Sequence, residues 1–201
     1  SFNNSGSDGI PDLGFNLWLV DKVTENNGMG GSHKLNPTTY YSYTGGNYNY
    51  KDKELLGFAL VDEIKPNISV IRHSFHQSNV LKGRESKKEY LSDSSRHYKI
   101  EEFSWNESAQ NGYNIASLTS IKSSLYDGAY TVPKTTKTDY SYDSYGNPTV
   151  IISQGDNSTI GDEKYEYKEY VYNATAWIVN GPNREYVYGA DNSTLFRETK
   201  Y

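Results

Sequence analysis

Tyrosines at alternate positions, interrupted by turn-forming residues, most restrict what this chain can fold into. In the segment TDYSYDSYGNPTVII, Thr138–Ile152, Tyr140 and Tyr142 alternate with Ser141 and Asp143. Side chains of an extended strand alternate between its two faces with a period of two, so both tyrosines belong to one face. The pattern therefore predicts a strand with an aromatic face.

Residues that suit a tight turn follow this strand. Asp143 can accept hydrogen bonds from the backbone amides that come after it, and Gly146 can adopt the positive φ that closes a short hairpin. Pro148 comes just past the turn, where a residue without a paired backbone amide is tolerated. We therefore expect one β-hairpin across this segment, with a positive φ at Gly146.

Similar hairpins recur along the chain, about every 20 to 30 residues. Each combines alternating aromatic or aliphatic residues with Gly, Asn, Asp, Ser or Pro at the turn. We expect a covered strand, apolar on both faces, at Leu13–Thr24, and loops at residues 1–12 and 26–37. The other expected turns or breaks are Gly45–Gly46, Lys65–Asn67, Asp93–Ser95, Asn111–Gly112 and Asp191–Asn192.

The hairpins predict an all-β fold of successive antiparallel hairpins stacked into a curled sheet. A single hairpin is marginal in water, so neighbours must stack side by side to bury their aromatic faces. Hydrophobic residues make up only 35% of the chain while 20 residues are tyrosine, so much of the buried surface must be phenolic. A tyrosine ring is large but its hydroxyl needs a partner, which suits a wide, shallow sheet. We expect residues 1–201 to be a single repeat segment of a larger chain.

Charge and composition exclude several classes of function. The net charge is −5 and the only basic concentration is Lys82–Lys88, so binding to nucleic acid or anionic lipid would be weak. The chain has no cysteine, which excludes disulfides, thiolate zinc sites and a cysteine nucleophile. The sequence has no apolar run long enough to span a bilayer. We expect neither nucleic acid nor membrane as a partner of this segment.

Residues with possible metal chemistry have unfavourable spacing. His73 and His76 are three apart, so in a strand they point to opposite faces and cannot share one metal ion without distortion. Asp156, Asp162 and Glu163 could offer oxygen ligands to calcium, but their spacing fits no EF-hand and exposed acidic loops are common. We therefore expect no metal and no cofactor.

No arrangement of residues predicts an enzyme. Ser, His and Asp are abundant, but no G-x-S-x-G elbow positions a nucleophile. Glycosylation triplets are numerous, yet a chain so rich in Asn, Ser and Thr produces them by chance. They begin at Asn67, Asn106, Asn157, Asn173 and Asn192.

The segment YSYDSYGNPT, Tyr140–Thr149, resembles a YD repeat of the Rhs family. That repeat joins an aromatic residue, Tyr-Asp, a short spacer and Gly-Asn. On this resemblance Tyr140, Tyr142, Asp143, Gly146 and Asn147 form a structural repeat motif. The turns at residues 65–67 and 191–193 depart from the usual Asp/Gly-rich pattern, so we expect them to differ in type.

The order of segments over nearly the whole chain resembles the middle region of B components of insecticidal Tc toxin complexes and related virulence proteins. The segments include LGFNLWLVDKVT, YSYTGGNYNYKDKELLGFALV and TAWIVNGPNREYV. The resemblance implies a secreted bacterial β-shell that contains a cytotoxic effector before delivery. The implied partners are the remaining shell segments of the same chain, a C component with its enclosed effector, and an A component translocation channel. The implied role is containment without catalysis.

Two other functions stay open. Trp18, Trp105 and Trp177 could join the tyrosines in a sugar-stacking platform, which would need exposed and coplanar rings. Regular recurrence of rings in every hairpin favours packing against neighbouring strands instead. An adhesive cell-surface or wall-associated protein would share the same YD-repeat shell and would differ only in its flanking regions.

Overall fold

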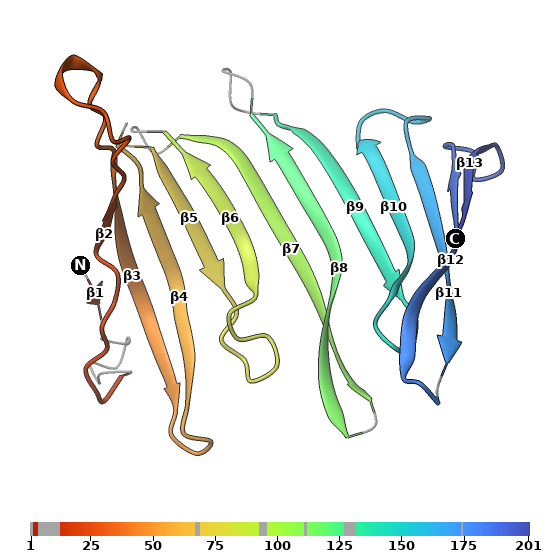
Figure 1. The fold of residues 1–201 in the computed structure, drawn as a ribbon, viewed down its shortest axis with the longest axis horizontal. Coiled ribbons are helices and arrows are strands. Elements are labelled where there is room, and N and C mark those ends of the chain that lie inside the picture. The colour runs from red at the N-terminus through yellow and green to blue at the C-terminus, as the bar shows by residue number, and fades with distance from the viewer. Residues whose placement is uncertain are drawn as a thin grey trace. The chain divides into compact units, whose positions relative to one another are not determined.

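The structure is a computed structural model that describes residues 2–3, 13–66, 69–92, 96–110, 112–126, 132–173 and 175–201. Apart from one short 3-10 helix, all its regular elements are β-strands (Figure 1). The chain divides into two compact units, Ser1–Ile100 and Glu101–Tyr201. The prediction of an all-β chain is confirmed.

The first unit is built around four long strands that pair in chain order. Their order is β3-β4-β5-β6, and the short strand β2 and the two-residue strand β1 both pair with β3. The segment before β3 holds the 3-10 helix η1 (Gly31–His33). The strands are β1 (Phe2–Asn3), β2 (Lys22–Thr24), β3 (Thr38–Asn49), β4 (Glu54–Ile64), β5 (Val70–Phe75) and β6 (Glu85–Leu91).

The second unit repeats the same principle with longer hairpins. Strand β7 (His97–Gln110) begins at the end of the first unit, and β8 to β13 follow in chain order. From β9 onward each strand is antiparallel to the one before it. Successive antiparallel hairpins were predicted from the turn residues, and this arrangement is confirmed. The strands are β8 (Tyr113–Leu125), β9 (Lys134–Tyr142), β10 (Pro148–Asp156), β11 (Lys164–Asn173), β12 (Ile178–Tyr188) and β13 (Leu195–Lys200).

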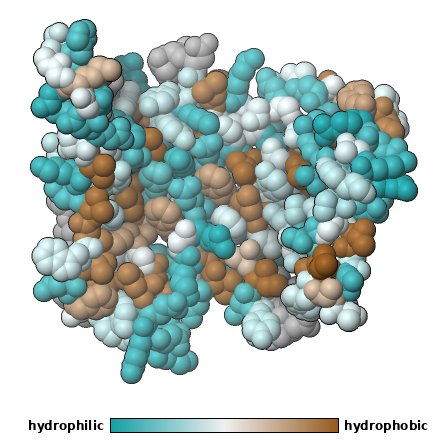
Figure 2. All heavy atoms as spheres, in the orientation of Figure 1, coloured by the Kyte–Doolittle hydropathy of each residue, from teal (hydrophilic) through white to brown (hydrophobic). Residues whose placement is uncertain are grey.

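Burial is shallow throughout the described residues. Only five hydrophobic side chains there are buried, and no large side chain is completely buried. Hydrophobic side chains are interspersed with hydrophilic ones on the face seen in Figure 2. Aromatic ring pairs, most of them between tyrosines, take the place of a dense aliphatic core, as the composition predicts. The five buried residues are Leu13, Leu56, Leu81, Leu91 and Val187.

The prediction of a hairpin that turns at Gly45–Gly46 is wrong. Strand β3 continues through both glycines, and the chain turns after Asn49 instead. A Cβ atom on Gly46 would lie 2.7 Å from Leu13 Cδ1, and Leu13 is only 2% exposed. Gly45 has a φ of +65°, and a Cβ there would meet the Ala59 Cβ at 2.9 Å. The two glycines make room for close packing inside a sheet rather than for a turn.

The prediction of a strand at Leu13–Thr24 is also wrong for most of that segment. Only Lys22–Thr24 forms a strand, and Trp18 is 100% exposed rather than covered. The reason lies in the edge of β3, where Phe2–Asn3 pairs with Tyr43–Thr44. That edge is already occupied, so the residues before Lys22 cannot extend the ladder along it.

Two further hairpins agree with the prediction. Strands β4 and β5 pair across the expected turn, where the Lys65 amide donates to the Ser69 carbonyl at 2.9 Å. Strands β12 and β13 pair across the turn at Asp191–Asn192. Asn67, Asp93–Ser95, Asn111 and most of residues 1–12 lie outside the described residues.

Candidate functional site: the Asp143 turn

The predicted motif lies on the hairpin of β9 and β10. Tyr140 is opposite Ile151, and Tyr142 is opposite Pro148, the first residue of β10. The Asp143 amide donates to the Asn147 carbonyl at 3.0 Å, which closes the turn. Gly146 has a φ of +87°, so the predicted positive φ is confirmed.

The Asp143 carboxylate holds this turn together. Its Oδ1 atom accepts hydrogen bonds from the Tyr145 amide at 2.8 Å and from the Asn147 amide at 2.9 Å. Its Oδ2 atom accepts from Asn147 Nδ2 at 2.9 Å and from the Tyr172 hydroxyl at 2.6 Å. Three of these donors belong to the turn itself, and the fourth comes from β11. The carboxylate thus fixes its own hairpin and ties it to the next one.

Asn147 extends the connection to a further strand. Its Nδ2 atom also donates to the Val179 carbonyl of β12 at 2.7 Å. The Tyr170 hydroxyl donates to the Pro148 carbonyl at 3.0 Å, and the rings of Tyr145 and Tyr172 lie 5.1 Å apart. One short turn is therefore bonded to both strands of the hairpin that follows it.

The two tyrosines of the motif contact neighbouring strands, and one of them bonds to the preceding hairpin. The Tyr142 hydroxyl donates to the Leu118 carbonyl of β8 at 2.8 Å, and burial raises the pKa of this tyrosine. Tyr140 is half-buried and faces the β-branched Ile151, as predicted. Tyr142 is opposite Pro148, so its pairing with β10 does not supply the aromatic or β-branched contact that we expect for this ring.

Electrostatics keep the Asp143 carboxylate ionised. Partial burial alone would raise its pKa, but the hydrogen bonds from Tyr172, Asn147 and Tyr145 outweigh it, so the pKa is lowered on balance. The same bond raises the pKa of Tyr172 to about 12. Proton transfer from the phenol to the carboxylate is therefore strongly unfavourable near neutral pH. The pair is suited to holding strands together rather than to acid–base chemistry.

Other hairpin turns use the same chemistry with different residues. The Asp191 carboxylate accepts from the amides of Ser193 and Thr194 and from the Thr194 hydroxyl, and these bonds hold the pKa of Asp191 well below its usual value. Asn192 takes a φ of +52°, so asparagine supplies the positive φ that the missing glycine would. In the first unit, Asn49 Oδ1 accepts from the amides of Lys51 and Asp52.

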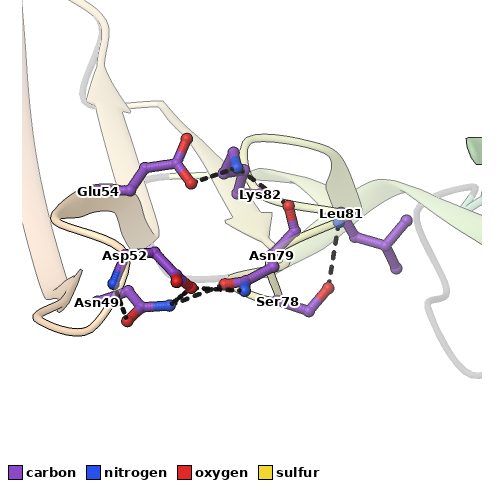
Figure 3. Close-up of polar contacts among 7 residues, drawn as sticks. All are labelled: Asn49, Asp52, Glu54, Ser78, Asn79, Leu81 and Lys82. Carbon is purple, nitrogen blue, oxygen red and sulfur yellow. Dashed lines mark hydrogen bonds and ion pairs between the residues drawn. The ribbon is translucent and has the colours of Figure 1, made fainter. Parts of the chain in front are cut away.

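In the first unit, side chains also connect two successive hairpins (Figure 3). At the tip of β3 and β4, Asn49 Nδ2 donates to Asp52 Oδ2 at 2.7 Å and to Asn79 Oδ1 at 3.2 Å. Asn79 lies in the loop between β5 and β6, and its Nδ2 atom donates to the same Asp52 oxygen. Lys82 from that loop pairs with Glu54 of β4 at 2.7 Å. The polar side chains point toward one another across the two loops.

Gln77 from the same loop reaches Gly45 of β3 and Gly57 of β4. Its Nε2 atom donates to the Gly45 carbonyl at 2.7 Å and to the Gly57 carbonyl at 2.9 Å. Gly57 has a φ of +85° at the register shift between β3 and β4. A bulge leaves some backbone groups without ladder partners, and here the side-chain amide supplies a donor to a carbonyl on each of the two strands near the bulge.

The histidines and the acidic loop have other partners. His73 Nδ1 lies 2.6 Å from Glu85 Oε1, and its ring stacks on Phe75. Asp162 accepts from the Asp156 amide, and Glu163 accepts from the Gly161 amide. Within the described part of the chain, no group of three or more histidine or acidic side chains could hold a metal ion.

The tryptophans lie in separate elements. Trp18 precedes β2, Trp105 is half-buried in β7, and Trp177 is 76% exposed in the turn before β12. This spacing does not bring the three rings together within one hairpin. In the described residues there is also no helix of the length and apolar character needed to cross a membrane.

Sequence reasoning missed Tyr172, Tyr170 and the Val179 carbonyl as partners of the motif. A signal for the tyrosines was available, because Tyr170 and Tyr172 are two residues apart, like Tyr140 and Tyr142. Pairs with this spacing on successive strands can lie on one face of a sheet. The choice of partner depends on which strands become neighbours, which the spacing alone does not give.

Comparisons with known proteins match both the sequence and the fold. Residues 2–88 match the family described as insecticide toxin TcdB middle/N-terminal region. No curated protein matches the sequence. The crystal structure of TcdB2-TccC3 has a TM-score of 0.60 and 14% identity, over 80% of this chain and 13% of that one.

Two further solved structures agree. The crystal structure of TcdB2-TccC3-Cdc42 has a TM-score of 0.59 and 12% identity, over 78% of this chain and 12% of that one. The Photorhabdus luminescens Tc holotoxin pore, with a substitution in TccC3, has a TM-score of 0.61 and 13% identity over the same shares. At such identity these structures establish the fold. This chain resembles the middle region of the B component of insecticidal Tc toxin complexes.

Proposed function

We propose that this chain is a structural segment of a bacterial toxin-encapsulating β-shell, which contains a cytotoxic effector before delivery. The observation that carries the proposal is the match of residues 2–88 to the TcdB middle/N-terminal region, on a fold of successive antiparallel hairpins. The chain covers only 12% to 13% of the length of the similar structures, so the role belongs to a longer protein. In this role residues 1–201 are one YD/Rhs-type repeat segment.

The side-chain bonds between hairpins support a containing role. A shell must keep neighbouring strands together over a wide, thin surface that has little buried core. Here Tyr142 bonds back to β8, and Asp143 and Asn147 bond forward to β11 and β12. We assign Tyr140, Tyr142, Asp143, Gly146 and Asn147 as the structural repeat motif that makes these connections. Each connection adds to the backbone ladder without lengthening any strand.

The proposed partners follow from the same assignment. They are the remaining shell segments of the same chain, a C component with its enclosed effector, and an A component translocation channel. The similar structures include TcdB2-TccC3 and a Tc holotoxin pore, which supports this set of partners. The complex is secreted, and this segment contributes packing rather than catalysis. It contacts neither nucleic acid nor membrane and uses no cofactor.

Protection of the effector from protease tests the proposal. The complete protein that contains this chain is produced together with its C component, and cleavage of the effector region by an added protease is followed over time. We expect the effector to be protected in the native complex and cleaved faster in an Asp143→Ala complex. The matched control is Tyr113→Phe, at a residue that is 75% exposed. Equal cleavage with and without the shell protein would refute the containing role.

A further inference from the structure

A shallow hollow lies over strands β11 and β12 of the second unit. It has a volume of about 540 Å³ and is lined by Tyr167, Glu169, Tyr186, Tyr188 and Asn192. The volume lies within the usual range for small-molecule sites. This β11–β12 hollow takes no part in the contacts of the Asp143 turn.

The register places the lining side chains on one face of the sheet. Tyr167 is opposite Tyr186, and Tyr165 is opposite Tyr188. Residues directly opposite each other, and residues two apart on one strand, lie on the same face, so these four side chains share a face. Glu169 is two residues after Tyr167 and therefore continues the same face. Strand pairing, rather than a flexible loop, thus holds the three rings and the carboxylate in place.

The rings form a corner rather than a flat platform. The rings of Tyr186 and Tyr188 are 6.3 Å apart and nearly parallel, with an interplanar angle of 27°. Tyr167 meets Tyr188 edge-on, at 5.7 Å and 78°. The Tyr167 hydroxyl donates to Asn192 Oδ1 at 3.0 Å, so the turn after β12 fixes this ring. Ring faces therefore border the hollow from different directions.

The one charged residue in the lining attracts a cation, although the Arg184 guanidinium lies opposite it in the register. Glu169 is the only charged residue among the five that line the hollow, and its side chain is exposed. Its Oε2 atom accepts a long hydrogen bond of 3.4 Å from Asn183 Nδ2, which leaves acceptor capacity for a ligand. Aromatic faces attract cations through their negative quadrupole, and a nearby carboxylate adds to this attraction. We infer that the β11–β12 hollow binds an alkylated ammonium ion.

A sugar fits the hollow less well. A pyranose stacks on a flat ring and needs several hydrogen-bond partners around its rim, whereas these rings meet at 78°. Of the two non-aromatic side chains in the lining, Asn192 already accepts from Tyr167. Alkyl groups on the ammonium ion would contact the ring faces while the charge lies near Glu169. The same chemistry occurs in a free quaternary amine, a choline headgroup and a methylated lysine side chain.

Arg184 provides an internal test of the assignment. It is opposite Glu169 in the register, and its Nη1 atom donates to the Tyr186 hydroxyl at 3.3 Å. The guanidinium is therefore a cation at the border of the hollow that opposes a cationic ligand. Arg184→Gln should strengthen binding of an ammonium ion, whereas it should not strengthen binding of a neutral ligand.

The experiment is a titration of the complete protein with tetramethylammonium chloride, followed by ligand-observed NMR at constant ionic strength. We expect saturable binding with a dissociation constant of about a millimolar. Glu169→Gln and Tyr186→Leu should each weaken it about two- to fivefold, the factor that a cation–π or carboxylate contact contributes at an exposed site. Asp21→Asn is the matched control, since it removes one negative charge at an exposed position of the other unit.

Further arms separate the sources of the ligand and the competing explanations. Choline, phosphocholine and a trimethyllysine peptide identify which carrier of the ammonium group binds most tightly. Neopentyl alcohol has a similar shape without charge. Equal affinity for this alcohol, unchanged affinity in Glu169→Gln, or absence of saturable binding would overturn the assignment. Saturable binding of a soluble polysaccharide that displaces tetramethylammonium would assign the hollow to a sugar instead.

Discussion

Tyr172 donates its phenolic hydroxyl to Asp143 Oδ2 over 2.6 Å, although 29 residues separate them in the chain. The carboxylate that shapes one turn is therefore also the acceptor for the next hairpin. A hydrogen bond to a charged acceptor is stronger than one between neutral groups, so this contact joins neighbouring hairpins through few atoms. It gives the Tyr-Asp sequence a physical role, because the aspartate serves two hairpins at once.

The pKa of Tyr172 gives a prediction for alkaline pH. Tyrosine has a pKa of 10.0 in the absence of interactions, and the bond to Asp143 raises it to about 12 in the folded chain. A raised pKa contributes stability that is fully present below pH 10 and is lost as the pH rises through about 12. The melting temperature should therefore fall across this window, and in Tyr172→Phe it should start lower and fall less steeply. Circular dichroism melting curves at successive pH values measure the effect.

The control for this titration is Tyr113→Phe, which removes a hydroxyl from a residue that is 75% exposed. Its melting temperature should follow the native slope. Other tyrosines with raised pKa values, Tyr43, Tyr142 and Tyr170, keep part of the alkaline dependence in every variant. If Tyr172→Phe loses stability as steeply as the native chain, the bond to Asp143 does not contribute as described.

The positive φ of Gly146 predicts a backbone effect without a steric clash. Its φ is +87°, and no heavy atom lies within 4 Å of a Cβ atom placed there. Gly146→Val should destabilise the chain by about 1 kcal/mol or more, because a β-branched residue is strained in this conformation. Gly146→Asn should cost less, since asparagine tolerates it. Chemical denaturation compares the two, and equal stabilities for both variants would contradict this account.

Gln77 offers a test of the bulged ladder in the first unit. Its amide donates to the carbonyls of Gly45 and Gly57, so Gln77→Leu should cost about 1 to 3 kcal/mol through two lost hydrogen bonds. Gln77→Glu has nearly the same shape but places an acceptor against two carbonyl oxygens, and it should cost more. Urea denaturation measures both. A glutamate variant as stable as the native chain would show that the two bonds contribute little.

Much of the hairpin pattern could be predicted from the sequence because turns and alternation are local. Gly146 and Asn192 take the positive φ that turn chemistry requires, and the strands around them alternate as expected. Local rules fail where the same residue type serves two purposes. Gly45 also has a positive φ, but it lies inside a strand, and the close approach of Leu13 to Gly46 there comes from a distant part of the chain.

The partners of the motif could not be predicted for a similar reason. Asp143 was identified as a turn residue, yet its bond to Tyr172 depends on which strand lies beside the turn. Leu13–Thr24 has an apolar pattern typical of a covered strand, but the edge it would need is occupied by Phe2–Asn3. In both cases the outcome depends on competition between segments for one neighbour, and periodicity contains no information on that competition.

Removing the hydroxyl of Tyr142 should weaken stability and containment, and removing its ring as well should weaken both further. Its hydroxyl donates to the Leu118 carbonyl of the preceding hairpin at 2.8 Å, and its ring is half-buried. Tyr142→Phe removes only the hydrogen bond and should cost about 1 kcal/mol, whereas Tyr142→Ala also removes the ring and should cost about 2 kcal/mol more. In the complete protein with its C component, protease should reach the enclosed effector fastest in the alanine variant, more slowly in the phenylalanine variant and slowest in the native complex. Stability and protection that follow this order support the ring as part of a shell. If Tyr142→Ala instead keeps full stability and abolishes binding of a soluble polysaccharide, the ring belongs to a sugar platform and the shell interpretation fails.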